Sequence, residues 1–127
     1  MRKMKNSKGF TLMEMLIVVA IIAILVAIMI PVMTSQLERA RETADLANLR
    51  SAYAEASVSA LSSESGTGTS SEVTFTQTTA GFDYVTDVPA YLKTATWTSV
   101  VETLKKGDKV TVSVDQDGTI TYAQVTG

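Results

Sequence analysis

The sequence predicts an α+β protein in which one long N-terminal α-helix packs on a small antiparallel β-sheet head. Residues 15–33 contain no charged or hydrogen-bonding side chain, which is typical of a membrane-spanning or fully packed helix. Apolar residues then recur at three- and four-residue steps to about residue 61, as on one face of an amphipathic helix. From residue 72 onward the period changes to two, which is the period of β-strands.

The composition excludes several classes of function. The chain of 127 residues has no His and no Cys, so it cannot form a Ser-His-Asp or Cys-His triad, a thiolate zinc site or a disulfide. Its net charge of -2 argues against nucleic acid as a partner. We therefore expect no enzyme and no cofactor.

The charge is unevenly distributed along the chain. Four of the eleven basic residues lie in residues 1–9, where there is no acid. The chain without this basic leader has seven basic and thirteen acidic residues, a side-chain charge of -6. We expect the leader to be followed by a hydrophobic helix at 10–33, an amphipathic half of the same helix at 34–61, and a globular head at 62–127.

The leader and the hydrophobic helix fit either a secretory signal or a membrane anchor. A secretory signal has an apolar region of about 7–15 residues and a small-residue cleavage site. The apolar run of this chain is longer and ends in Pro31-Val32-Met33-Thr34-Ser35, which is no such site. The basic residues on its N-terminal side predict a cytoplasmic N-terminus and an extracytoplasmic head.

Glu14 is the feature that a plain membrane anchor does not explain. A carboxylate at the start of a spanning segment is costly and is usually retained for a partner, although water near the headgroups relieves much of the cost. Glu14 is the fifth residue after Gly9 in Lys8-Gly9-Phe10-Thr11-Leu12-Met13-Glu14. This motif, followed by an unbroken apolar helix, resembles the class III signal of type IV prepilins and pseudopilins. The resemblance covers the leader and roughly the first third of the chain.

The resemblance implies a pilin-like fold and a processing route. A membrane-embedded prepilin peptidase of the family would cut between Gly9 and Phe10 and methylate the new amine of Phe10. The family glutamate maps onto Glu14, which would pair with the Phe10 amine of an adjacent subunit, set the assembly register and indicate a major pilin of the filament shaft. The family's helix-interrupting proline maps onto Pro31. Proline lacks an N–H group and predicts a kink or local loosening, either as a bend at the bilayer surface or as a joint for filament packing.

Beyond Pro31 the helix is predicted to continue with two apolar faces. The first consists of Leu37, Ala40, Ala44 and Ala47, and the second of Leu46, Leu49, Tyr53, Ala56 and Ala60. Charged residues lie outside these faces at helical spacing, and we expect them on a solvated or inter-subunit face. They are Glu38, Arg41 and Asp45.

The head is predicted to be an antiparallel sheet that covers the second apolar face. Residues 62–71 are rich in Ser, Thr and Gly and predict an exposed loop, either a plain connection or a surface for glycans or contacts. Strands are expected at 72–76, 109–114 and 119–122, with the last two joined as a hairpin by the turn at 115–118. Because the chain has no Cys, we expect the hairpin between Val110 and Tyr122 to close the sheet by hydrogen bonds and packing alone.

Three other segments of the head give weaker signals. Residues 82–85 favour a strand. Val100, Val101 and Leu104 suit a short amphipathic helix, whereas residues 96–98 favour a strand. We leave the two interpretations of this last segment open.

Acidic residues of the head give no convincing metal site. Asp115, Asp117 and Gly118 resemble part of a calcium loop, but the further acidic ligands and the terminal Glu of an EF-hand are missing. A hairpin turn is the better interpretation. Asp83, Asp87 and Asp108 would have to be brought together by the fold.

These features predict a structural subunit of a type IV pilus. Its partners would be other copies of itself in a helical homopolymer, prepilin peptidase, the pilus assembly platform and minor pilins. The precursor would lie in the cytoplasmic membrane and the mature subunit in an extracellular filament used for adhesion, motility or DNA uptake. The alternatives are a pseudopilin of a type II secretion or competence system, and a membrane-anchored extracytoplasmic binding domain.

Overall fold

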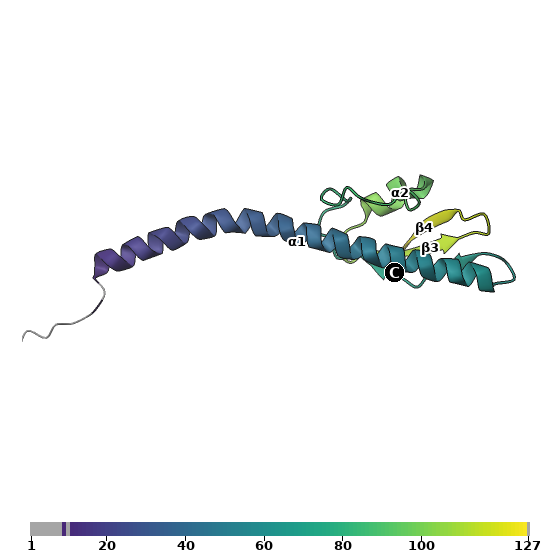
Figure 1. Ribbon diagram of the computed structural model, residues 1–127, viewed down its shortest axis with the longest axis horizontal. Helices are drawn as coiled ribbons and strands as arrows, with labels where there is room; N and C mark the ends of the chain where they lie inside the picture. Colours follow the sequence, from purple (N-terminus) through teal and green to yellow (C-terminus); the bar gives the residue numbers. More distant parts are fainter. Residues whose placement is uncertain (1–8, 10, 127) are drawn as a thin grey trace, which may run out of the picture. The chain divides into compact units, whose positions relative to one another are not determined.

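The computed structural model describes Gly9 and residues 11–126. The chain divides into two compact units, Met1–Ser35 and Gln36–Gly127. Helix α1, Leu12–Ser62, begins in the first unit and ends in the second (Figure 1). The elements that follow are β1 (Gly68–Thr69), β2 (Val73–Thr74), α2 (Ala95–Val100), the 3-10 helix η1 (Val101–Thr103), β3 (Lys109–Val114) and β4 (Ile120–Val125). A long N-terminal helix with a small antiparallel four-stranded sheet is the predicted α+β, pilin-like arrangement.

The part of α1 in the first unit has no internal core. Every residue from 11 to 34 is exposed, including large hydrophobic side chains such as Leu12, Ile21 and Ile28. Residues 12–30 contain no Gly and no Pro, so nothing in the sequence interrupts the helical hydrogen bonds there. This stretch is therefore a regular helix whose apolar surface is uncovered within its own unit.

The part of α1 in the second unit buries one of its two predicted apolar faces together with three acidic side chains. Of the face predicted to lie under the sheet, Leu46, Leu49 and Ala56 are buried and the other two members are partly buried, which confirms it. The other apolar face is exposed at all four of its members: Leu37, Ala40, Ala44 and Ala47. The buried positions in that stretch are Glu38, Glu42 and Asp45. The expectation of a solvated or inter-subunit face for Glu38 and Asp45 is therefore wrong.

The sheet is built around β3. Strand β4 pairs antiparallel with β3 along its whole length, from Lys109 opposite Val125 to Val114 opposite Ile120. The short strands β1 and β2 pair with the two ends of β3 and therefore share its other edge. Ser70 bridges the gap between them, because its N–H donates to Val112 O at 2.8 Å and its Oγ accepts from Val112 N at 3.0 Å. The predicted hairpin is confirmed.

The core of the second unit joins α1, the sheet and α2. Its buried hydrophobic residues include Leu46 and Leu49 on α1, Val110 and Val112 on β3, and Trp97 on α2. The Tyr122 hydroxyl donates to Leu92 O at 2.7 Å, and the Tyr122 N–H donates to Thr96 Oγ1 at 3.1 Å. These two hydrogen bonds connect β4 to Leu92 and to α2, so the last strand is held in place without a disulfide.

Three local expectations for the head differ from the structure. The predicted strand at 72–76 is shortened to Val73–Thr74, and residues 82–85 form no strand. Residues 96–98 belong to α2, so the helical interpretation of that segment is confirmed and the strand interpretation is wrong. The predicted loop at 62–71 contains β1 and is not fully exposed. Gly68 is buried there because its backbone lies against α1, where an added Cβ would come within 1.9 Å of Ala56 O.

Candidate processing and assembly site

The start of α1 is fixed by a reciprocal pair of hydrogen bonds. The Glu14 N–H donates to Thr11 Oγ1 at 3.2 Å, and the Thr11 N–H donates to Glu14 Oε2 at 3.3 Å. This is the capping box of a Ser/Thr followed three residues later by Glu, and it satisfies two N–H groups that the first turn leaves free. The Glu14 carboxylate also lies in the first turn, where the helix dipole favours a negative charge.

The residues of the predicted cleavage site lie immediately before this capping box. Gly9 is outside the helix and exposed, and a Cβ added to it would meet nothing within 4 Å. Phe10, the residue predicted to become the methylated N-terminus, lies outside the described residues.

The apolar segment after Glu14 has the length and composition of a membrane span. An 18-residue window of α1 has a mean hydropathy of 3.3, and none of it is buried. A helix that is apolar all round and uncovered requires lipid or other apolar surfaces around it. A lipid bilayer would provide such an environment, as would the apolar surfaces of other protein chains.

Pro31 lies inside α1, and the helix continues through it without interruption. Side chains directly after the proline bond back to carbonyls of the same region, Thr34 Oγ1 to Pro31 O and Ser35 Oγ to Val32 O, both at 2.9 Å. Such back-bonding accompanies bends in helices. The chain thus stays helical at Pro31, and its use as a joint in a filament is a prediction.

Two of the acidic residues considered as metal ligands, Asp115 and Asp108, have local structural uses. The Gln116 N–H donates to Asp115 Oδ1 at 2.8 Å, and the Gly118 N–H donates to Asp115 O at 2.8 Å, which builds the hairpin turn. The Asp108 carboxylate accepts from Lys105 N at 3.0 Å in the turn before β3. Over Gly9 and residues 11–126, no three acidic side chains gather as a group that could hold a metal ion.

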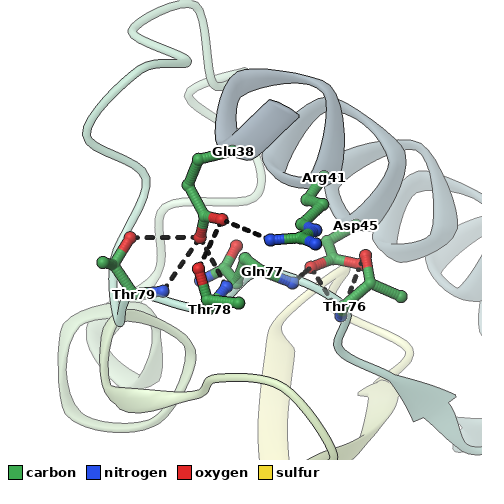
Figure 2. Close-up of polar contacts among 7 residues, drawn as sticks. All are labelled: Glu38, Arg41, Asp45, Thr76, Gln77, Thr78 and Thr79. Carbon is green, nitrogen blue, oxygen red and sulfur yellow. Dashed lines mark hydrogen bonds and ion pairs between the residues drawn. The ribbon is translucent and has the colours of Figure 1, made fainter. Parts of the chain in front are cut away.

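Sequence reasoning missed a second constellation, on the buried face of α1 in the second unit. Glu38, Glu42 and Asp45 are spaced four and three residues apart, so all three point to the same side of the helix. They face residues 76–85, a segment without regular secondary structure. Figure 2 shows Glu38 and Asp45 reaching from the helix to the backbone of residues 76–79.

Each of the three carboxylates accepts several hydrogen bonds from this segment. Asp45 accepts from Thr76 N, Thr76 Oγ1 and Gln77 N at 2.8–3.0 Å. Glu42 accepts from three consecutive N–H groups, those of Asp83, Tyr84 and Val85, at 2.8–3.2 Å. The remaining contacts involve Glu38, which accepts from the N–H and Oγ1 of both Thr78 and Thr79.

Arg41 is the cation beside these carboxylates. Its Nη1 lies 3.2 Å from Glu38 Oε2, an ion pair between residues three apart on the helix. Burial raises the pKa of Glu38, but the hydrogen bonds from Thr78 and Thr79, together with Arg41, outweigh it and lower the pKa to about 2. Glu38 is therefore ionised at neutral pH although only 5% of its surface is exposed.

The comparisons with known proteins agree with the N-terminal site. Residues 4–30 match the family model for the prokaryotic N-terminal methylation motif. No curated protein and no solved structure gives a significant match to the chain. The motif match points to a structural role and indicates no enzymatic family. The match and the apolar N-terminal helix together support a type IV pilin-like or pseudopilin precursor with a class III signal, a methylation site and a transmembrane anchor.

Proposed function

We propose that this chain is the major subunit of a type IV pilus, cut between Gly9 and Phe10, methylated at Phe10 and polymerised with copies of itself. The observation that carries the proposal is the methylation motif at residues 4–30, which includes the start of an apolar helix whose membrane-span window has no buried residue. Cleavage before that helix removes the basic leader and keeps the helix in the product. The mature subunit then has an apolar surface that must lie in lipid or against other subunits.

Glu14 has two roles in this proposal. Before assembly it caps its own helix through Thr11. During assembly its charge pairs with the N-terminal amine of Phe10 on a neighbouring subunit. In an apolar filament core, such a pair matters because an unpaired carboxylate there is very costly. The pair therefore sets the register of neighbouring subunits.

Processing is tested by a Gly9→Ala variant, with Ser7→Ala in the same leader as the matched control. A Cβ at position 9 meets no neighbour within 4 Å, so the substitution leaves the structure of the chain intact. We expect Gly9→Ala to accumulate in the membrane at precursor size, whereas Ser7→Ala is shortened normally. Blotting of membrane and surface fractions measures this, and a Gly9→Ala chain of wild-type size and distribution would refute processing at this bond.

The two roles of Glu14 are separated by a second pair of variants. Glu14→Gln keeps the capping box, because Gln also fits its third position, but removes the charge. Thr11→Ala removes the cap and keeps the charge. We expect Glu14→Gln to be cleaved and inserted yet to give no filaments, while Thr11→Ala still assembles. Filaments at normal yield from Glu14→Gln would exclude charge pairing as the source of register.

A pseudopilin of a secretion or competence machine shares the same N-terminal motif and is the second candidate. The two functions are separated by the amount of filament on the cell surface at native expression. Long, abundant filaments support a pilus subunit, whereas short assemblies that remain in the envelope support a pseudopilin. A chain that stays monomeric in the membrane after cleavage would support an anchored binding domain.

A further inference from the structure

Residues 76–85, called the strap below, are held in place mainly by hydrogen bonds from their backbone N–H groups to side-chain carboxylates of α1. Seven of their backbone N–H groups donate to Glu38, Glu42 or Asp45. Over the part of the chain that the structure describes, no backbone group of residues 76–85 bonds to another backbone group. The N–H groups that a strand would pair with a neighbouring strand are paired here with three side chains of α1.

Apolar packing holds the strap only in part. Phe82 and Val85 are its partly buried hydrophobic residues, and neither is fully buried. The Phe82 ring lies 5.5 Å from that of Trp97 and 6.4 Å from that of Phe75. Gln77 adds two bonds from its Nε2, to Gly81 O at 2.9 Å and Leu104 O at 3.1 Å. Among the residues that the structure describes, none donates a hydrogen bond to the buried amide oxygen of Gln77.

The sheet is stabilised by backbone hydrogen bonds between its own strands. Strands β3 and β4 are joined by a six-residue antiparallel register, which needs no contribution from the carboxylates. Proteins open locally in cooperative units whose stability follows the contacts that each unit makes. A segment held by three side chains and a sheet held by a backbone ladder are therefore expected to open separately.

We propose that the strap is a conformational device that opens as one unit when the charge of the carboxylates is removed, while the sheet stays folded. Charged acceptors bind N–H groups more strongly than neutral ones, so neutralising a single carboxylate weakens several bonds at once. Opening moves Phe82 away from Trp97, which is the only Trp of the chain and is 2% exposed when the strap is closed.

The charged and titratable groups around the strap are few. On α1 they are the three carboxylates and Arg41, which contacts Glu38. On the strap they are Asp83 and Tyr84, whose side chains are exposed while their N–H groups bind Glu42. Outside these two segments, Lys93 and Glu102 line a pocket together with residues of the strap. Over residues 11–126, α2, η1 and the sheet make no hydrogen bond or ion pair to the three carboxylates, whose direct side-chain contacts come from the strap and from Arg41.

Hydrogen–deuterium exchange of the full chain in detergent micelles tests this at peptide resolution. The variant is Glu42→Gln, and the matched control is Glu55→Gln, an exposed α1 carboxylate that binds Ser71. We expect amides 76–79 as well as 83–85 to exchange about tenfold faster in Glu42→Gln, the effect of weakening charge-assisted hydrogen bonds. Amides of β3 and β4 keep their wild-type rates, and the control changes neither set.

Two outcomes would overturn the proposal. Faster exchange confined to residues 83–85 would show that the carboxylates act separately and that the strap is no unit. Equal acceleration in the strap and in β3 and β4 would show that the strap does not open separately from the sheet.

If Glu42→Gln does not fold, Thr78→Val replaces it, since this substitution removes one hydroxyl donor to Glu38 and keeps the backbone N–H. For that variant, faster exchange confined to residues 76–79, or equal acceleration in the strap and in β3 and β4, overturns the proposal. Acceleration that extends to residues 83–85, with Trp97 fluorescence shifting to longer wavelength, supports it.

Discussion

The carboxylates of the two units differ in their burial and in how far along the chain their hydrogen-bond partners lie. In the first unit, Glu14 is exposed, and its carboxylate accepts a hydrogen bond from Thr11, three residues away. In the second unit, Glu38, Glu42 and Asp45 are buried and bind a segment that is 31 to 43 residues away along the chain. The carboxylate of the first unit caps its own helix, whereas those of the second hold a distant segment of the chain in place. The fold of the second unit therefore depends on its carboxylates, while Glu14 contributes to the start of α1.

The largest effect is expected from removing a buried carboxylate of the second unit. Asp45→Ala leaves the N–H groups of Thr76 and Gln77 without an acceptor, and unsatisfied buried groups cost about 1–3 kcal/mol each. We expect a loss of about 3 kcal/mol in the free energy of unfolding, measured by urea denaturation in detergent. Glu14→Ala should leave this value unchanged, and an equal loss in both variants would contradict the comparison.

A slightly smaller loss is expected from Gly68→Ala. The new Cβ would lie 1.9 Å from Ala56 O and 2.3 Å from Ala60 N, so β1 must move away from α1. Overpacking of this kind costs about 1–3 kcal/mol. The measurement is again denaturation, and Gly9→Ala, which meets no neighbour, is the matched control. Unchanged stability of Gly68→Ala would mean that β1 does not approach the helix this closely.

Acid should weaken the second unit through Glu38. Its pKa is lowered from 4.5 to about 2 on folding, so its stabilising contribution is present above about pH 4.5 and is lost as the pH falls toward 2. We expect the stability difference between the wild type and Glu38→Gln to be large at pH 7 and to shrink by pH 2.5. Thermal unfolding at the two pH values measures it, and a difference independent of pH would refute this role of the Glu38 charge.

The smallest effect is expected at the start of the first unit. Thr11→Ala removes the N-cap, which is worth about 1 kcal/mol of local helix stability. We expect faster amide exchange at residues 12–15 with no change in the unfolding of the second unit. Unchanged exchange at these residues would show that the capping box does not fix the helix start.

Much of this fold follows from local patterns in the sequence. The hairpin of β3 and β4 follows from the two-residue period around a turn with Gly118, and the face Leu46 to Ala60 follows from helical spacing. Thr11 three residues before Glu14 is also the sequence signature of a capping box, which could be predicted from the sequence.

The burial of the carboxylates of the second unit could not be predicted from local patterns in the sequence. Glu38 and Asp45 are predicted on a solvated or inter-subunit face of the helix, yet they are buried, and Glu42 is buried with them. Their burial depends on N–H groups of a distant segment without strand or helix pattern, which no local period reveals. The available signal was the spacing of three acids on one helix side, combined with a Thr-rich segment whose backbone needs acceptors.

Sheared surface material from cells that produce this protein provides the most direct test of the account, by electron microscopy together with N-terminal sequencing of the main band. If the chain is a processed pilus subunit, we expect long filaments whose subunit begins at methylated Phe10. A surface protein that begins at Met1, or a processed chain that forms no filament, would contradict it.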